Sequence, residues 1–499
     1  MDSGLPAGRT HGRSGRTRRA IFPAATQEIL MAQRSFDAIV IGGGPGGYVC
    51  GIRLGQLKQK VLVIEREEVG GVCLNWGCIP SKALISASHS YEKLTHSENM
   101  GLFADNVRVD VPKMQDWKNG IVKKLTGGIR GLFKGNSVEL AMGTARLVGP
   151  KLVEITAADG TKEVVEATKA IVIATGAETI EIPSFKFDGK QVIGAREAVS
   201  LTSVPKRLAV IGGGVIGTEL GGVYQRLGAE LTIIEATDQI LPGTEPELAK
   251  IVEKTFVKHG AKVVKNAMAK SMERQADGSI VVNVEVGGGV EKVVCDVLLV
   301  AVGMRANTAS LGLEAAGVKA DRGMIPTDIQ GRTNVPHIFA IGDVAGGPLL
   351  AHKASKEGEV VAEVIAGHKA AKDWVAIPGA IFTDPEVGTM GLTEAQAKAK
   401  GIDILVGTFP FASLGRAMAV GETDGLFKVI ADKKTHEVLG VHICGPSATD
   451  LICEGVLAVE MHAFLEDIGL SIHPHPTLGE GLMEASMAAL GQAIHKLNR

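Results

Sequence analysis

The chain has 499 residues, of which 45% are apolar and 22% charged, and its formal net charge is −2. This is the composition of an ordinary globular protein, and the length predicts three or four domains of about 150 residues each. A near-neutral charge and an aromatic content of 4% exclude nucleic acid as an expected partner, and no uncharged apolar run reaches the roughly 18 residues that cross a membrane.

Residues 1–31 differ from the rest of the chain, because they are rich in arginine and poor in acidic residues. We predict that they are disordered and lie outside the fold. Two interpretations stay open: a targeting peptide, which would place the protein in the mitochondrial matrix or a plastid, or a start codon assigned too far upstream. The second, with Met31 as the natural start, is favoured and predicts a bacterial cytoplasmic protein.

The first predicted element is a βαβ unit. It comprises an apolar strand, Phe36–Ile41, a glycine turn, Gly42–Gly47, a helix to about Lys58, and a strand, Lys60–Ile64, that ends at Glu65. The glycines allow a tight turn and let the backbone approach a pyrophosphate at the helix N-terminus. The acid at the end of the second strand can accept hydrogen bonds from a ribose diol. The unit therefore predicts a dinucleotide site.

Two cysteines, Cys73 and Cys78, follow this unit directly. In a regular helix this spacing separates the Cα atoms by about 7.5 Å, beyond the roughly 7 Å limit for a disulfide, so the segment must bend if the thiols bond. Gly77 gives it the freedom to bend. Pro80 is predicted as the first residue of the next helix, which places Cys78 at a helix N-terminus beside Lys82, where a thiolate is favoured. Unrelated core thiols are the alternative, which the position after the glycine unit disfavours.

A second unit repeats the first pattern. Arg207–Ile211 is a strand, Gly212–Gly217 a glycine turn, a helix runs to about Leu227, and the strand Leu231–Ile234 ends at Glu235. Two such units predict two dinucleotide-binding domains. A carboxylate at the end of the second strand repels a 2′-phosphate, so NAD is favoured over NADP; alternatively, this acid only ends a strand at the surface.

The remaining elements are read from shorter patterns. Val293–Val302 is predicted as one strand, and Asn334–Ile341 leads into a glycine and an aspartate. From about Ile377 the chain is predicted to form a separate α+β domain, with strands such as Leu426–Ile430 and a helix over Ala448–Phe464. The four cysteines outside the pair are predicted to be core thiols, and Tyr48 in the first glycine helix is predicted only to pack.

Near the C-terminus stands a short segment with His473, His475 and Glu480. A histidine can move a thiol proton near neutral pH, and a carboxylate can fix its tautomer. A structural turn and a metal site are the alternatives. No further cluster of ligand residues accompanies the histidines in the sequence, so we predict no metal.

From Ser35 to its end the chain resembles the dihydrolipoamide dehydrogenases of the pyridine nucleotide-disulfide oxidoreductase family. The resemblance rests on four segments: Gly70–Lys82, Ile338–Val344, Leu350–Ala354 and His475–Glu480. It implies an α/β fold with two Rossmann-like dinucleotide-binding domains, for FAD and NAD, and a C-terminal α+β dimerisation domain. The predicted division is an extension at 1–31, an FAD-binding domain at 32–178 and 305–376, an NAD-binding domain at 179–304 and a dimerisation domain at 377–499.

The resemblance also implies roles for single residues. Cys73 is the thiol that meets the substrate, Cys78 is the thiol against the flavin, and His475 with Glu480 forms the catalytic base. The FAD site would comprise Gly42, Gly44, Gly47, Glu65, Lys82, Ala145, Thr175, Gly176, Asp343 and Ala351. The NAD site would comprise Gly212, Gly214, Gly217, Glu235, Met268 and Gly303. Two positions depart from the family pattern: Ala145 stands where a glycine is frequent, and Trp76 replaces a smaller aliphatic residue.

The implied enzyme is a homodimer in which each active site takes its histidine from the other subunit. It would oxidise protein-bound dihydrolipoamide and reduce NAD through the cysteine pair and FAD, as the E3 component of 2-oxo acid dehydrogenase complexes or with the glycine cleavage carrier. The alternative enzyme is a related NAD(P)H-dependent disulfide reductase of the glutathione reductase type, which would carry cations after Glu235 for NADPH. A non-enzymatic nucleotide-binding sensor would lack a cysteine or the histidine.

Overall fold

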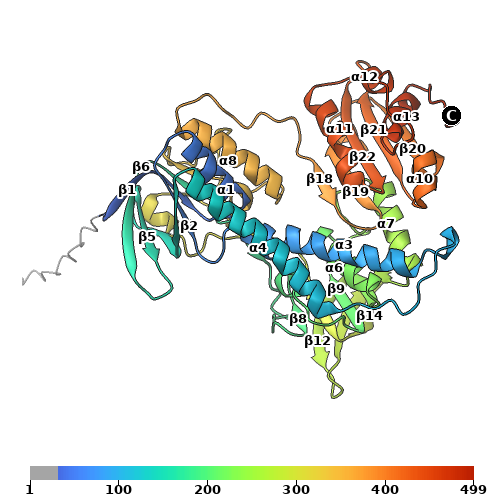
Figure 1. The fold of residues 1–499 in the computed structure, drawn as a ribbon, viewed down its shortest axis with the longest axis horizontal. Coiled ribbons are helices and arrows are strands. Elements are labelled where there is room, and N and C mark those ends of the chain that lie inside the picture. The colour runs from blue at the N-terminus through green and yellow to red at the C-terminus, as the bar shows by residue number, and fades with distance from the viewer. Residues whose placement is uncertain (1–31, 499) are drawn as a thin grey trace, which may run out of the picture.

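The computed structural model describes residues 32–498 (Figure 1). The predictions for residues 1–31 lie outside this described part. No helix within it is both long and apolar enough to cross a membrane.

The first sheet has seven strands and contains the first predicted βαβ unit. Strands β1, β2, β3, β6 and β17 pair in parallel, while β5 pairs antiparallel with β6, and β4 pairs antiparallel with β5 at the edge. All five residues of β2 are buried, as expected for a parallel strand covered on both faces. The strands are β1 (Arg34–Ile41), β2 (Val61–Glu65), β3 (Val138–Met142), β4 (Thr144–Leu147), β5 (Leu152–Thr156), β6 (Lys162–Ile173) and β17 (Ile338–Ala340).

The second sheet is parallel and has the order β11-β10-β9-β15-β8. It repeats the first unit, with α6 (Val215–Arg226) between β9 and β10 as α1 (Pro45–Gln56) lies between β1 and β2. The mixed α/β architecture expected from the sequence is confirmed. The strands are β8 (Val192–Ile193), β9 (Arg207–Ile211), β10 (Glu230–Ile234), β11 (Lys262–Val264) and β15 (Val297–Val300).

The prediction of one strand over Val293–Val302 is wrong. The run divides into β14 (Gly289–Cys295), which joins a three-stranded antiparallel sheet with β12 (Ala267–Arg274) and β13 (Ile280–Val286), and β15 of the parallel sheet. Between them Asp296 accepts hydrogen bonds from the backbone N–H of Arg207 at 3.0 Å and from its guanidinium at 2.5 Å. The chain changes sheets at this polar residue, which an apolar pattern alone does not mark.

The C-terminal sheet is antiparallel, with the order β18-β19-β22-β21-β20, and helices cover it. This confirms the expected α+β domain. The predicted helix over Ala448–Phe464 ends earlier, at Glu460, because His462 takes a positive φ of 52° and Phe464 begins the next helix as its N-cap. The strands are β18 (Gly379–Ile381), β19 (Glu386–Gly391), β20 (Ile404–Pro410), β21 (Leu426–Asp432) and β22 (Val438–Gly445).

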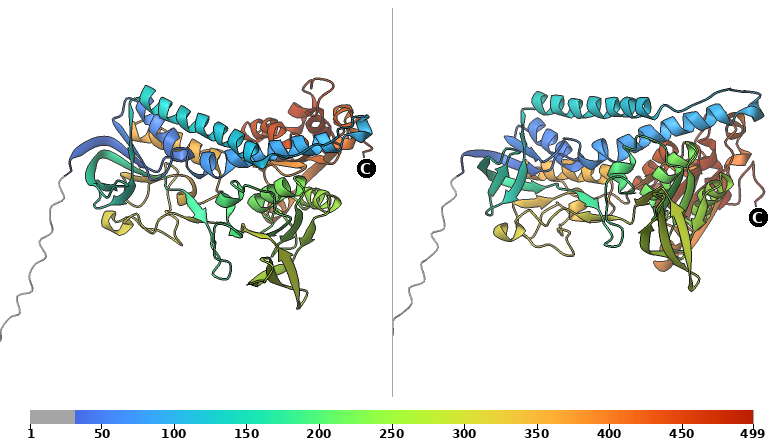
Figure 2. Two further views of the ribbon diagram at one scale, coloured as in Figure 1. Left: turned by 60° about the horizontal axis from the view of Figure 1, so that its bottom comes forward. Right: turned by 90° about the horizontal axis from the view of Figure 1, so that it is seen from below.

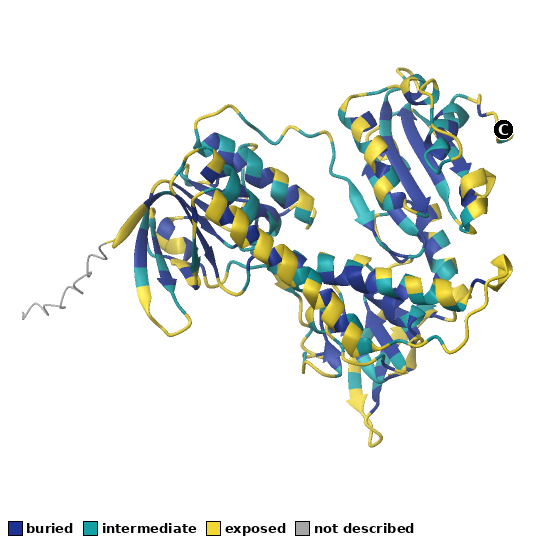
Figure 3. Ribbon diagram, viewed as in Figure 1, coloured by how far each residue is buried: buried dark blue, intermediate teal, exposed yellow. Residues whose placement is uncertain are grey.

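The helices fill the spaces between these sheets. α3 packs against both α4 and α6, and the views in Figure 2 show α3 and α4 running along one face of the molecule. Figure 3 shows buried strands and exposed outer helix surfaces. The helices are α1 (Pro45–Gln56), α2 (Gly71–Asn75), α3 (Cys78–Thr95), α4 (Val111–Gly135), α5 (Ala195–Ala198), α6 (Val215–Arg226), α7 (Pro246–Lys258), α8 (Ala351–Ile365), α9 (Glu394–Ala399), α10 (Gly415–Val420), α11 (Ala448–Glu460), α12 (Leu465–Gly469) and α13 (Glu480–Ala489); β7 (Ala177–Thr179) and β16 (Met304–Ala306) form a separate two-stranded ribbon.

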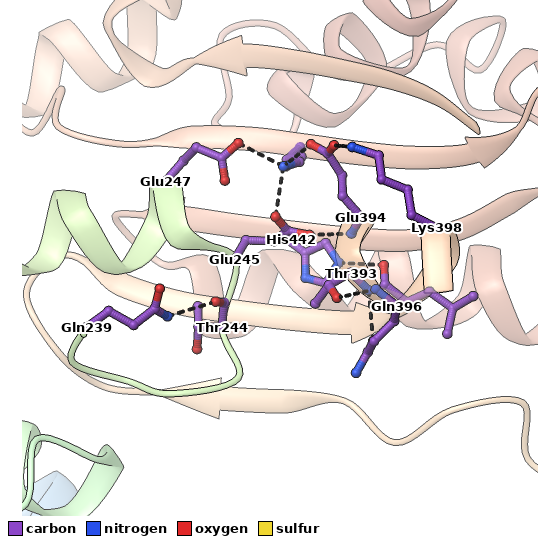
Figure 4. A network of polar contacts seen from close by, with 11 residues as sticks. Gln239, Thr244, Glu245, Glu247, Thr393, Glu394, Gln396, Lys398 and His442 are labelled. Carbon is purple, nitrogen blue, oxygen red and sulfur yellow. Dashed lines mark hydrogen bonds and ion pairs between the residues drawn. The ribbon is translucent and has the colours of Figure 1, made fainter. Parts of the chain in front are cut away.

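A buried charge network joins the start of α7 to the C-terminal sheet (Figure 4). The ammonium of Lys428, on β21, is 1% exposed and lies 2.9 Å from Glu245, 3.0 Å from Glu247 and 2.5 Å from Glu394. Burial alone would lower the pKa of Lys428, but the hydrogen bonds to the three carboxylates raise it above its usual range. The cation therefore stays charged and ties the two parts of the molecule together.

Candidate active site

The cysteine pair lies on the bend that the sequence predicts. Cys73 is on α2, and α3 begins at Cys78, so Cys78 does lie at a helix N-terminus. Pro80 is the third residue of α3 and not its first, because the helix starts with the cysteine itself. The bend is tight at Gly77, where a Cβ atom would lie 3.0 Å from the carbonyl oxygen of Val72. Both cysteines are free thiols in this structure.

The two thiols have opposite electrostatic properties. A hydrogen bond from the Cys73 thiol to Cys78, helped by the charge of Lys82, lowers the pKa of Cys78 to about 7. Partial desolvation acts in the opposite direction, but Cys78 itself is exposed. The same hydrogen bond, together with burial, raises the pKa of Cys73 far above its usual range. When this dithiol loses a proton, the negative charge therefore resides on Cys78, with Cys73 as the hydrogen-bond donor.

Lys82 connects the cysteine helix to the second glycine helix. Its ammonium lies 2.7 Å from a carboxylate oxygen of Glu219 on α6 and 4.5 Å from the ring centre of Phe382. The other oxygen of Glu219 accepts a hydrogen bond from the Phe382 backbone N–H at 2.9 Å. The sequence analysis missed Glu219, although a carboxylate among the apolar and small residues of that helix is a signal that could have identified it.

The first glycine turn fits a dinucleotide. Gly42 has a φ of +106°, and a Cβ atom at Gly47 would overlap the carbonyl oxygen of Gly42, so both glycines are required by the turn itself. At Gly44 the nearest atom to a Cβ would be 3.8 Å away, which leaves room for a ligand against the backbone. The carboxylate of Glu65 accepts hydrogen bonds from the N–H groups of Gly43 and Glu67, both at 2.7 Å, and each oxygen keeps a further lone pair for a ribose hydroxyl.

The other residues expected at the FAD site come from later parts of the chain. Asp343 lies in the 3₁₀ turn η3 (Gly342–Ala345), where burial raises the pKa of its carboxyl. Ala351 is the first residue of α8, so its backbone N–H belongs to the free amides of a helix N-terminus.

The hydroxyl of Thr175 donates to the carbonyl of Asn307 at 2.8 Å, and Gly176 follows with a φ of +65°. Ala145 is buried in β4, and its methyl group packs in the apolar core.

The second glycine turn repeats this geometry. The carboxylate of Glu235 accepts from the N–H groups of Gly213 at 2.6 Å and Thr237 at 2.7 Å, as Glu65 does in the first unit. Gly212 has a φ of +105°, a Cβ atom at Gly217 would overlap the Gly212 carbonyl oxygen, and Gly214 faces open space.

A cavity of about 270 Å³ lies beside this second turn. Ala236 and Met268 line it, together with the tip of the β13–β14 hairpin. Gly303, with a φ of +128°, follows β15 at the same edge of the sheet. Of the residues expected to bind NAD, Met268 lines this cavity, and Glu235 directly precedes Ala236 in its wall.

His475 and Glu480 form a pair at the start of α13. The imidazole Nδ1 lies 2.8 Å from one carboxylate oxygen, and the other oxygen accepts from the Thr477 N–H at 2.8 Å. Burial would raise the pKa of Glu480, but these two hydrogen bonds lower it. Because a carboxylate only accepts, Nδ1 carries the proton, and Nε2 is the free basic nitrogen.

This pair does not meet the cysteines within one chain. The His475 side chain is 78% exposed, and its contact among the described residues is Glu480. In Figure 1, α12 and α13 lie at the far edge of the C-terminal domain, away from the N-terminal end of α3. His473 pairs with Glu454 instead, at 2.9 Å.

The structure also bears on the predictions for the four other cysteines, for Trp76 and for Tyr48. Cys50, Cys295 and Cys444 are buried as predicted, but Cys453 is exposed on α11, so it is not a core thiol. Trp76 is covered by the guanidinium of Arg196 from α5, at 4.0 Å from its ring centre, and Arg196 also pairs with Glu67. Tyr48 packs against the apolar cluster that includes Cys73, as predicted.

Comparisons with known proteins agree with this geometry. Residues 36–358 match the model of the pyridine nucleotide-disulfide oxidoreductase family, and residues 377–486 match its dimerisation domain. The chain is similar to dihydrolipoyl dehydrogenases of Geobacillus stearothermophilus, at 50% identity over 93% of this chain and 98% of that protein, and of Bacillus subtilis, at 49% over 92% and 97%. The crystal structure of LpdA from Mycobacterium tuberculosis superposes with a TM-score of 0.84 at 25% identity, over 90% of this chain and 98% of that one.

Proposed function

Since the chain belongs to the pyridine nucleotide-disulfide oxidoreductase family, we propose that it is a dihydrolipoyl dehydrogenase, which oxidises dihydrolipoamide to lipoamide and reduces NAD⁺ to NADH. The observation that carries the proposal is the cysteine pair: Cys78, with its pKa lowered to about 7, lies on the helix that Lys82 and Glu219 connect to the second glycine unit. A thiolate is thus held between two dinucleotide sites.

FAD and NAD are the cofactors, and the residues around the two glycine turns fit them. We assign FAD to the first turn with Glu65, Asp343 and Ala351, and NAD to the second turn with Glu235 and Met268. When bound, FAD would supply the two-electron chemistry that links the dithiol side to the reduction of NAD⁺. The proposed division of the chain follows: 32–178 with 305–376 for FAD, 179–304 for NAD and 377–499 for dimerisation.

The chain's own residues perform the thiol chemistry. His475, held by Glu480, removes a proton from one thiol of the substrate, and the resulting thiolate attacks Cys73 in the oxidised Cys73–Cys78 disulfide. The disulfide breaks, and Cys78 leaves as a thiolate that its environment stabilises. The second substrate thiol then attacks the mixed disulfide, which releases lipoamide and the Cys73 thiol. Two electrons have moved from the substrate to the cysteine pair.

The protein is a homodimer of the kind that the dimerisation domain forms. We propose that the base acts across the subunit boundary, on the partner subunit's Cys73, because His475 is exposed and remote from the cysteines of its own chain. Large apolar side chains are exposed near it, with Ile472 at 99% and Leu470 at 76%, which supports a contact surface here.

The expected partner is a lipoyl-carrying protein of a 2-oxo acid dehydrogenase complex or of the glycine cleavage system. This part of the proposal rests on the resemblance to the dihydrolipoyl dehydrogenases. A reducing compartment, such as the bacterial cytoplasm, is proposed as the location, because the four cysteines outside the Cys73–Cys78 pair form no structural disulfide among the described residues.

An anaerobic assay of the purified protein tests the proposal. We expect rapid NADH formation from dihydrolipoamide with NAD⁺, little with NADP⁺, and a long-wavelength thiolate-to-flavin absorbance band in the reduced protein. His475→Gln should lower dithiol turnover by about 10² to 10⁴ and leave flavin binding intact. His368→Gln, which alters an exposed histidine–glutamate pair of the same kind, is the matched control. Strong preference for NADPH and glutathione disulfide would identify the glutathione reductase type instead.

A further inference from the structure

The turn that presents Asp343 is held by two buried charged side chains on α8 to which the sequence analysis assigned no role. The ammonium of Lys353 donates to the carbonyl of Gly346 at 2.6 Å and to that of Gly342 at 3.2 Å. The carboxylate of Glu357 accepts from the N–H of Gly342 at 2.7 Å. Three backbone groups at the two ends of the turn are therefore bound by one pair of side chains.

Lys353 and Glu357 also pair with each other, 3.3 Å apart, and each side chain is only 5% exposed. A buried ion pair is weak evidence of stabilisation, because apolar residues of similar volume often stabilise a protein equally well. What apolar residues could not replace are the hydrogen bonds to the turn. The two side chains therefore hold the backbone of the turn in place, and their attraction for each other does not account for this role.

The same helix contacts the first glycine unit. α8 packs against α1, and a Cβ atom at Gly358 would lie 2.6 Å from the carbonyl oxygen of Gly46 and 3.1 Å from the backbone nitrogen of Cys50. Ala354 lies against Gly46 as well. One stretch of α8 thus touches both the glycine helix, through Ala354 and Gly358, and the Asp343 turn, through Lys353 and Glu357.

We propose that the Lys353–Glu357 pair is a positioning device for FAD: it fixes the Asp343 turn at the distance from the first glycine turn that the bound dinucleotide needs. The inference rests on the proposed function only in that FAD occupies the first glycine site. Neither side chain is a catalytic residue, because both act through the backbone of the turn.

The test separates flavin retention from folding. Holoenzyme variants are compared by FAD release on dilution, followed by flavin fluorescence, and by thermal unfolding, followed by far-UV circular dichroism. Lys353→Met and Glu357→Gln each leave one buried group without its partner, so both measurements should change. The double variant Lys353→Met/Glu357→Leu removes both charges and should recover much of the unfolding temperature.

The decisive result is FAD release from the double variant. We expect it to stay at least about tenfold faster than in the unaltered protein, the effect of losing hydrogen bonds to charged groups. Lys356→Met/Glu359→Leu, which removes an exposed pair 2.7 Å apart on the same helix, should release FAD at the unaltered rate.

Unaltered FAD release from the double variant would overturn the inference, because Lys353 and Glu357 would then only compensate each other's charge. The same conclusion would follow if the single variants unfolded earlier but kept FAD normally until they unfolded. If a single variant does not fold, the double variant still decides the question. An unaltered protein that binds no FAD would instead contradict the proposed function.

Discussion

At the scale of residues, chemistry depends on which of two similar side chains carries a charge. Cys73 and Cys78 belong to one short segment, yet the structure lowers the pKa of Cys78 and raises that of Cys73. The difference arises because Cys73 donates to Cys78 and Lys82 supports the acceptor. This order suits a reaction in which Cys73 receives the substrate and Cys78 retains the charge.

A pH titration of the reduced protein tests this order. The thiolate of Cys78 should form with a midpoint near pH 7, so the long-wavelength thiolate-to-flavin band should grow above that pH and disappear below it. Cys73→Ala removes the hydrogen-bond donor and should move the midpoint upward, toward the ordinary thiol value of about 8.5. Cys453→Ala, at an exposed thiol elsewhere, should leave it in place. A titration midpoint that is the same in Cys73→Ala as in the unaltered protein would contradict the assigned hydrogen bond.

At the scale of elements, the glycines of each turn perform separate tasks. Gly217 is required by the packing of α6 on its own turn, while Gly214 borders open space and has an ordinary φ of −74°. Gly217 is therefore needed for folding, whereas the open space at Gly214 is needed for the ligand.

Two alanine substitutions should separate these tasks. Gly217→Ala forces a methyl group onto the Gly212 carbonyl and should lower the thermal stability of the protein. Gly214→Ala should change the free energy of unfolding by less than about 0.5 kcal/mol but raise the KM for NAD⁺. Thermal unfolding and steady-state kinetics measure the two effects. Equal loss of stability in both variants would refute the distinction.

The contact between α7 and β21 gives a second prediction at this scale. Lys428→Met leaves Glu245, which is 2% exposed, without its cation, and this should destabilise the protein by about 3 to 5 kcal/mol. Glu247→Gln alters a carboxylate that is 52% exposed, and its effect should be below about 1 kcal/mol. Urea unfolding of both variants measures the difference. Similar effects of the two changes would show that burial does not govern this network.

At the scale of the whole molecule, one chain contains the residues proposed for both halves of the reaction but keeps them apart. The cysteines lie on α2 and at the start of α3, whereas His475 is exposed just before α13, which Figure 1 shows away from the N-terminal end of α3. A second copy of the chain can join the halves if each dimer site takes its cysteines from one subunit and its histidine from the other.

Mixed dimers test this arrangement. A dimer of one Cys73→Ala chain and one His475→Gln chain has one site with both defects and one site with neither, so it should recover about half of the original activity. The matched control pairs Cys73→Ala with the Cys73→Ala/His475→Gln double variant and should stay inactive. Assembly from differently tagged chains allows the mixed dimer to be purified and assayed. An inactive mixed dimer would place the histidine and cysteines of one site in the same chain.

The sequence by itself determined the two βαβ units, the bend at the cysteines, and the α+β character of the last domain. These features depend on local rules: apolar periodicity, glycine at a positive φ, and a proline that marks the start of a helix, although α3 begins at Cys78 and not at the predicted Pro80. The His475–Glu480 pair could also be predicted, because both residues belong to one short segment.

Only the tertiary structure decided the rest, since it depends on residues far apart in the chain. The apolar run at 293–302 divides because Asp296 bonds to Arg207, about ninety residues earlier, which no local pattern shows. The partners of Lys82 and Trp76, namely Glu219 and Arg196, likewise come from the segment 179–304, far from both residues in the sequence. Sequence periodicity reports which side chains are buried, but the identity of their partners is fixed only when distant elements pack together.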